Sequence, residues 1–102
     1  MRNYEVAFIV HPDLEEGAFE EVLEKVKGWI TNGGSIISDV DLWGKRRMAY
    51  EIRKQTEGQY VFMQTEMEPA FTAELERNFG LEESIMRFMI TSPTAVAQAP
   101  SE

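Results

Sequence analysis

The sequence contains no cysteine, one histidine and few basic residues: ten lysines and arginines stand against eighteen acidic residues. The lack of cysteine excludes disulfides, zinc–thiolate sites and a cysteine nucleophile. The single histidine, His11, leaves no second histidine for a metal site, and no nucleophile motif accompanies it. We therefore expect no catalytic residue, no metal and no cofactor, and we interpret His11 as a solvated turn residue.

Long hydrophobic runs are also absent. The N-terminal stretch MRNYEVAFIV is interrupted by Glu5 and is too short for a signal-peptide core or a membrane span. We expect a soluble, cytoplasmic protein that contacts no membrane and takes no small-molecule substrate. The length of 102 residues and the hydrophobic fraction of 43% predict one folded domain with a modest core.

Hydrophobic periodicity predicts the first helix and the strand before it. Residues 4–10 alternate as a strand does, with Glu5 and Ile9 on the face opposite the core. A repeat of three and four residues predicts a helix up to Asn32, with Asp13 and Glu16 as its capping box.

The second half of the chain predicts a hairpin, a helix and a last strand. Residues 35–53 form a strand with a bulge at Gly44, residues 54–58 form the turn, and residues 59–67 form the returning strand. The following helix is expected to begin at Pro69 and to end at Gly80, and the last strand is expected over residues 84–91.

The order of these elements, β-α-β-β-α-β, predicts an α+β fold of the ferredoxin-like type. Its antiparallel sheet should have the strand order 4-1-3-2 and carry both helices on one face, which leaves the other face as a candidate working surface. The domain is expected over residues 1–91, and the aperiodic residues 92–102 are expected to form a disordered tail. An acylphosphatase-like enzyme on this fold is not favoured, because the acidic first loop, VHPDLEEG, supplies no arginine.

Half of the positive charge lies in ten residues. Residues 45–54 carry five bases and one acid, a local charge of +4, so the rest of the chain carries −12. Edge strands use basic residues against edge-to-edge pairing, but one or two suffice for that purpose. We predict phosphate binding by Lys45, Arg46, Arg47, Arg53 and Lys54, with Arg2 and Arg87 as further candidates. Arg2 begins the first strand, away from the hairpin turn, and need not join the same patch.

The free sheet face should carry apolar residues. Tyr60 and Phe62 point there if Val61 and Met63 face the helices. The expected partner-binding residues are Ile9, Tyr50, Tyr60, Phe62 and Met89; scattered apolar surface residues are the alternative. The stretch EGQYVFM is faintly similar to a strand of the RNA-recognition domain, but the carboxylate of Glu5 on the same face argues against base stacking.

The stretches MRNYEV and WGKRRMAYEIRKQTEGQYVFM resemble the sixth protein of the bacterial small ribosomal subunit, and the likeness extends over residues 1–91. Its pattern of Gly, two or three basic residues, an apolar residue, Ala-Tyr, any residue, Ile and a basic residue is met from Gly44 to Arg53. Met48 replaces the usual Leu and Glu51 a common Pro; Gly58 and Tyr60 fit the continuation.

The resemblance implies a non-catalytic, structural ribosomal component. Such proteins bind the central domain of small-subunit ribosomal RNA as a heterodimer with a small basic protein, the eighteenth of that subunit. The acidic surface would then meet the basic partner, and the basic hairpin would meet RNA. Glu51 should weaken a phosphate contact near it. The alternative is a ferredoxin-like protein-interaction module without RNA contact.

Overall fold

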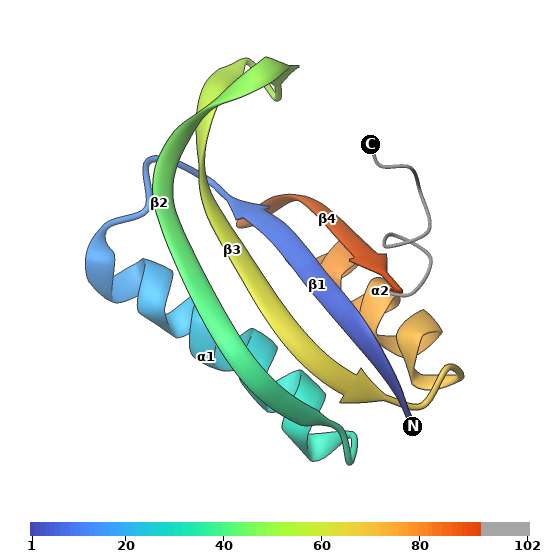
Figure 1. Cartoon of the computed structure of the whole chain (residues 1–102). Coiled ribbons are helices and arrows are strands. Elements are labelled where there is room, and N and C mark those ends of the chain that lie inside the picture. The colour runs from blue at the N-terminus through green and yellow to red at the C-terminus, as the bar shows by residue number, and fades with distance from the viewer. Residues whose placement is uncertain (93–102) are drawn as a thin grey trace.

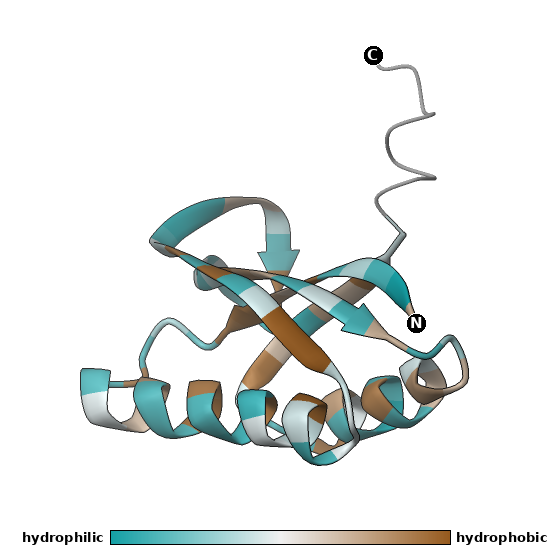
Figure 2. Cartoon of the chain, turned by 60° about the horizontal axis from the view of Figure 1, so that its bottom comes forward, coloured by the Kyte–Doolittle hydropathy of each residue, from teal (hydrophilic) through white to brown (hydrophobic). Residues whose placement is uncertain are grey.

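The computed structural model of the chain describes residues 1–92. Its elements are β1 (Arg2–Val10), α1 (Glu16–Asn32), β2 (Ile36–Ile52), β3 (Gln55–Met67), α2 (Phe71–Leu81) and β4 (Ile85–Thr91). The strands form one antiparallel sheet in the order β2-β3-β1-β4, and both helices cover the same face of it (Figures 1 and 2). The predicted fold and strand order are therefore confirmed. The predicted tail, apart from Ser92, lies outside the described residues, and the domain boundary at residue 91 stays a prediction.

The hydrophobic core lies between the sheet and the two helices. Alternate residues of β1 and β3 point into it and are at most 2% exposed: Val6, Phe8, Val10, Val61, Met63, Thr65 and Met67. The centre is Phe79 of α2, whose ring centroid lies 5.3 Å from that of Phe8, 5.5 Å from that of Trp29 and 5.1 Å from that of Phe88. This parity is the one that the sequence predicts, so the odd-numbered residues of β1 are left for the opposite, open face.

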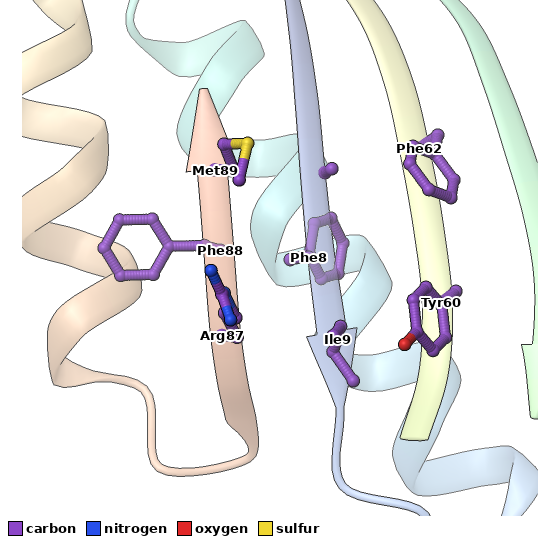
Figure 3. A pocket seen from close by; sticks show the side chains of 8 residues that line it. Phe8, Ile9, Tyr60, Phe62, Arg87, Phe88 and Met89 are labelled. Atoms are coloured by element: carbon purple, nitrogen blue, oxygen red, sulfur yellow. The ribbon is translucent and has the colours of Figure 1, made fainter. Parts of the chain in front are cut away.

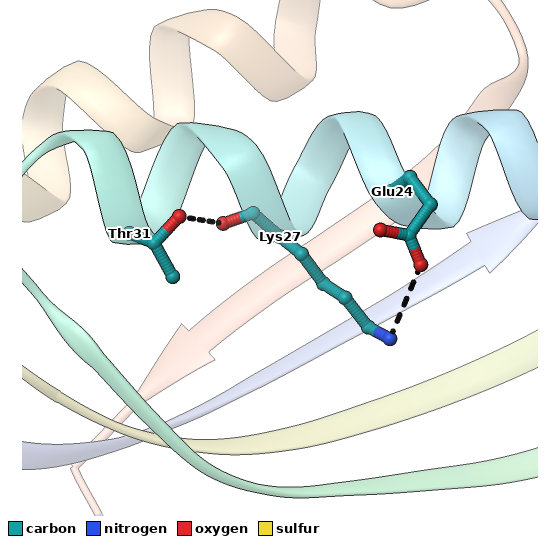
Figure 4. A network of polar contacts seen from close by, with 3 residues as sticks. All are labelled: Glu24, Lys27 and Thr31. Carbon is teal, nitrogen blue, oxygen red and sulfur yellow. Dashed lines mark hydrogen bonds and ion pairs between the residues drawn. The ribbon is translucent and has the colours of Figure 1, made fainter.

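The helix layer contains two ion pairs. Along α1, Lys27 Nζ lies 3.4 Å from Glu24 Oε2, and Thr31 Oγ1 donates a hydrogen bond to the carbonyl oxygen of Lys27 (Figure 4). Lys25 Nζ donates to Glu82 Oε1 at 2.8 Å and so ties α1 to the end of α2. This hydrogen bond lowers the pKa of Glu82 below its ordinary value, against the opposing effect of partial burial.

The first helix ends at Asn32 as predicted, but the other three helix ends differ from their prediction. Asp13 and Glu16 form no capping box, because the N-cap of α1 is Glu15, and the backbone N–H of Asp13 donates instead to Nδ1 of His11. Pro69 precedes α2, which begins at Phe71; the carbonyl oxygen of Pro69 accepts from the hydroxyl of Thr72 at 2.7 Å. At the other end, Gly80 does not terminate the helix, which runs one residue further, to Leu81.

The hairpin turn is tighter than predicted. It consists of Arg53 and Lys54 alone, with φ angles of 52° and 64°, and Ile52 pairs directly with Gln55. Positive φ at both central residues is the signature of a two-residue turn that matches the twist of its strands, for which Asn-Gly is the usual sequence. The sequence lacks that dipeptide, and the turn was therefore predicted over residues 54–58. Residues 55–58 belong instead to β3.

Candidate functional site

The β2–β3 hairpin contains a bulge at Gly44, as predicted. Leu42 pairs with Val61 and Gly44 pairs with Tyr60, so Trp43 is an extra residue without a partner on β3. Gly44 has a φ of 77°, which glycine adopts without strain. The bulge places the Trp43 ring against the open face, with its centroid 4.6 Å from that of Phe62.

The five cations of residues 45–54, which we call the basic hairpin, are all exposed: Lys45, Arg46, Arg47, Arg53 and Lys54. Among residues 1–92, the ion pairs within 4 Å involve the N-terminal amine, Lys25 and Lys27, and none involves the basic hairpin. Arg46 is nevertheless engaged, because its Nε donates to the carbonyl oxygen of Trp43 and its guanidinium lies 5.1 Å from the Trp43 ring centroid. The charge of the hairpin is thus not neutralised by the acids of the described chain.

The other predicted cations occupy different places. Arg53 donates from Nη1 to the carbonyl oxygen of Glu83, in the loop between α2 and β4, at 2.7 Å. Arg87 on β4 lies beneath the hairpin, with its guanidinium 5.6 Å from the Tyr50 ring centroid. Arg2 pairs with Met67, at the end of β3 that is remote from the turn. The seven cations therefore do not form a single patch.

The open face carries an apolar depression of about 200 Å³. Tyr60 and Phe62 line it from β3, Ile9 lines it from β1, and Arg87 and Met89 line it from β4 (Figure 3). Met89 is 49% exposed, although it is a large apolar side chain on a regular strand. Together with Tyr50, which lines an adjoining depression with Ile9 and Tyr60, all five predicted partner-binding residues are brought together.

Sequence reasoning missed one member of this surface, Trp43, which is 45% exposed. Its indole Nε1 donates to Asp41 Oδ2 at 2.9 Å, and this hydrogen bond fixes the ring beside Phe62. Simple alternation along β2 does not predict this position. The signal that could have found it is the bulge at Gly44, since an inserted residue changes which face its neighbours occupy.

The two ends of the sheet carry charge of opposite sign. The register places Glu5, Gln64 and Asp39 in one row across β1, β3 and β2, at the end remote from the hairpin turn. Glu66 follows in the next row, and Asp41 pairs with Phe62. We call Glu5, Asp39, Asp41 and Glu66 the acidic end. Along the sheet, the acidic end is therefore followed by the apolar depression and then by the basic hairpin. Arg46 pairs with Gly58 on the open face, whereas Lys45 and Arg47 pair with Gln59 and Glu57 and so share the parity of the opposite face.

This arrangement defines a binding domain with an open antiparallel sheet. Among residues 1–92, no three His, Asp or Glu side chains are grouped so that they could hold a metal ion. Within the same residues, no helix is long and apolar enough to cross a membrane. What the site offers is a set of exposed cations for a polyanion and an apolar face for a macromolecular partner.

Comparison with known proteins identifies the class more closely. The model of the family described as "Ribosomal protein S6" matches residues 3–92. The small ribosomal subunit protein bS6 of Moorella thermoacetica is 47% identical over 91 residues, which is 89% of this chain and 93% of that protein. The bS6 of Clostridium novyi is 43% identical over 93 residues, covering 91% and 98% of the two chains. The crystal structure of 30S ribosomal protein S6 from Thermotoga maritima, 30% identical, superposes with a TM-score of 0.88 over 95% of this chain and 92% of that one.

The chain therefore belongs to the ribosomal protein S6 family. The resemblance seen in residues 1–91 is confirmed, and so is the prediction of a structural, non-enzymatic protein of the small ribosomal subunit. A location in the bacterial cytoplasm, on the ribosome, follows from the same membership.

Proposed function

We propose that the protein binds the central domain of small-subunit ribosomal RNA together with a small basic protein, the eighteenth of the subunit. The basic hairpin contacts RNA phosphates, and the open face receives the protein partner. The observation that carries this proposal is the sequence of surfaces along the sheet. Exposed cations that form no ion pair within the described residues lie at one end, carboxylates lie at the other, and the apolar depression lies between them.

Lys45, Arg47 and Lys54 are the best candidates for direct phosphate contact. They are exposed and form no ion pair within the described residues, so their charge is available to a polyanion, although Arg47 stands opposite Glu57 on β3. Arg46 can contribute its outer side while its Nε stays on the Trp43 carbonyl. For Arg53 and Arg87, the contacts within the chain favour an indirect role, and the position of Arg2 favours a separate contact.

The partner surface combines shape and charge. Ile9, Tyr60, Phe62 and Met89, flanked by Tyr50, present apolar area of the kind that anchors protein interfaces. The acidic end lies on the same face, so a cationic protein docked there finds complementary charge, which speeds association and fixes orientation. This complementarity also explains how a chain of charge −8 can join an RNA assembly: the partner screens it.

Co-purification with a tagged partner protein and a central-domain RNA fragment tests both contacts. The double variant Lys45→Ala, Arg47→Ala should retain the partner and lose RNA, whereas Phe62→Ala should weaken retention of the partner. Matched controls are Lys27→Ala with Arg77→Ala, which removes the same charge from the helix layer, and Leu81→Ala, which removes a 76% exposed apolar side chain from α2.

The alternative, a protein-interaction module without RNA contact, is favoured by the apolar face alone. It predicts that the hairpin variant and its control retain RNA equally, because any RNA would be held by the partner. Equal loss of RNA in the hairpin and control variants would contradict the proposal as well. It would show that RNA retention depends on the net charge of the protein and not on the position of the cations.

A further inference from the structure

The tip of the β2–β3 hairpin is bent over the open face (Figure 1). Arg47 pairs with Glu57 and Ile52 pairs with Gln55, so the four residues 48–51 of β2 stand opposite a single residue of β3, Thr56. An insertion of this size bends a strand and twists it away from its partner. Although it lies near the tip, Met48 is only 7% exposed, because the bend turns it inward.

Two contacts join the bent tip to the opposite edge of the sheet. Arg53 donates from Nη1 to the carbonyl oxygen of Glu83 at 2.7 Å and from Nη2 to that of Ile85 at 3.4 Å. Tyr50 places its ring over the guanidinium of Arg87 on β4. A hollow of about 220 Å³ adjoins the second contact and is lined by Tyr50, Arg87, Met48 and Ile52. The hairpin thus spans β3 and β1 and is attached at β4.

The chemistry of Arg53 suits attachment to a backbone. A guanidinium offers several N–H donors in a planar fork, and it can reach two carbonyl oxygens of one strand entrance at the same time. The turn residues Arg53 and Lys54 both hold a left-handed conformation without being glycine or asparagine. Such residues persist where the surrounding structure holds them, and the bonds from Arg53 are the observed restraint.

We propose that Arg53 and the Tyr50–Arg87 contact form a clasp that fixes the bent hairpin. Arg53 is then a positioning residue and not a phosphate ligand. Its guanidinium is bonded to the carbonyl oxygens of Glu83 and Ile85, whereas its neighbour Lys54 is exposed and available to the polyanion. A fixed hairpin binds more tightly than a mobile one, because less conformational freedom is lost on binding. The clasp itself needs only the protein; its consequence for RNA rests on the proposed function.

Three variants separate the clasp from simple charge. Lys54→Asn is the matched control for Arg53→Asn: each removes one cation from the same turn, and asparagine tolerates positive φ at both positions. Arg53→Lys keeps the charge but loses the planar fork. Amide hydrogen exchange of residues 48–56 should accelerate on the order of tenfold in both Arg53 variants, the loss expected for one charged hydrogen bond, and should not change in Lys54→Asn.

The salt dependence of RNA binding, measured with the partner present, provides the second readout. Lys54→Asn should reduce the slope of log affinity against log salt by about 0.7 to 0.9, the value for one phosphate contact. Arg53→Asn should weaken binding with the slope unchanged. Unchanged exchange in both Arg53 variants overturns the clasp, and a loss of slope in Arg53→Asn equal to that in Lys54→Asn overturns the positioning role. If the wild-type complex binds no RNA, the proposed function fails, and the exchange measurement still decides the clasp.

Discussion

One methyl group added at Gly58 should disturb the packing of the open face. A Cβ built there would lie 2.2 Å from Cγ2 of Ile9, and the backbone oxygen of Val10 is 3.6 Å away. Carbon atoms in contact are about 3.5–4.0 Å apart, so the overlap exceeds about 1 Å. Either Ile9 leaves its rotamer, or β1 and β3 separate. Ile9 lines both depressions, so either response also disturbs the partner surface.

Gly58→Ala should therefore lower the free energy of unfolding by about 1–3 kcal/mol, the usual cost of overpacking. For a domain of this length, the midpoint of thermal unfolding should fall by roughly 4–8 °C per kcal/mol. Thermal and urea unfolding followed by circular dichroism give both values. Gly28→Ala is the control: its Cβ meets only a side-chain atom at 3.9 Å, and alanine in the middle of α1 should stabilise the protein by up to about 1 kcal/mol.

A double-mutant cycle identifies the contact. In an Ile9→Ala background the clashing Cγ2 is absent, so Gly58→Ala should cost no more than about 0.5 kcal/mol, and the coupling energy should be about 1–3 kcal/mol. Equal destabilisation by Gly58→Ala in both backgrounds would refute the reasoning, because it would mean that the cost does not arise at Ile9.

Two further predictions concern the core and the helix layer. Phe79→Ala should destabilise the protein by about 3–5 kcal/mol in urea unfolding, since Phe79 contacts three aromatic rings and is 1% exposed; a cost below about 1 kcal/mol would show that the ring cluster contributes little. Because the pKa of Glu82 is lowered in the folded protein, its ionised form contributes stability above the unfolded-state pKa of about 4.3. That contribution is lost as the pH falls through the folded-state pKa. The wild type and Glu82→Gln should thus differ in unfolding free energy at pH 6, and this difference should vanish in acid. Glu24→Gln is the control: it breaks an exposed ion pair and should change the unfolding free energy little at either pH. A Glu82→Gln difference independent of pH would contradict the linkage.

Much of the fold could be predicted because burial is periodic. In residues 6–10 of β1 and residues 61–67 of β3 every second residue is buried, and in α1 the buried residues recur at three and four positions, so both the elements and their faces follow from the sequence. The first residues of the helices could not be predicted in the same way. At Asp13 and Pro69 two capping signals compete with turns held by backbone hydrogen bonds, and a choice between them depends on the neighbouring chain.

The site was predicted as a set of residues and not as a geometry. Charge clustering identified the basic hairpin, but nothing local to Arg53 shows that the bend in β2 carries it to Glu83, thirty residues away. The same holds for Arg87 and Tyr50, which meet only because the hairpin crosses the open face. Trp43 joined the apolar surface through a bulge whose position was predicted and whose effect on side-chain direction was not.

The salt dependence of the assembled complex tests the central claim most directly. Binding of the protein and its partner to the central-domain RNA fragment is measured from about 50 to 400 mM KCl, for the wild type and for the triple variant Lys45→Ala, Arg47→Ala, Lys54→Ala. If these three cations each neutralise a phosphate, the slope of log affinity against log salt should become shallower by about 2 to 3 in the triple variant. The same slope for both proteins would contradict the account, because the charge of the hairpin would then play no part in holding RNA.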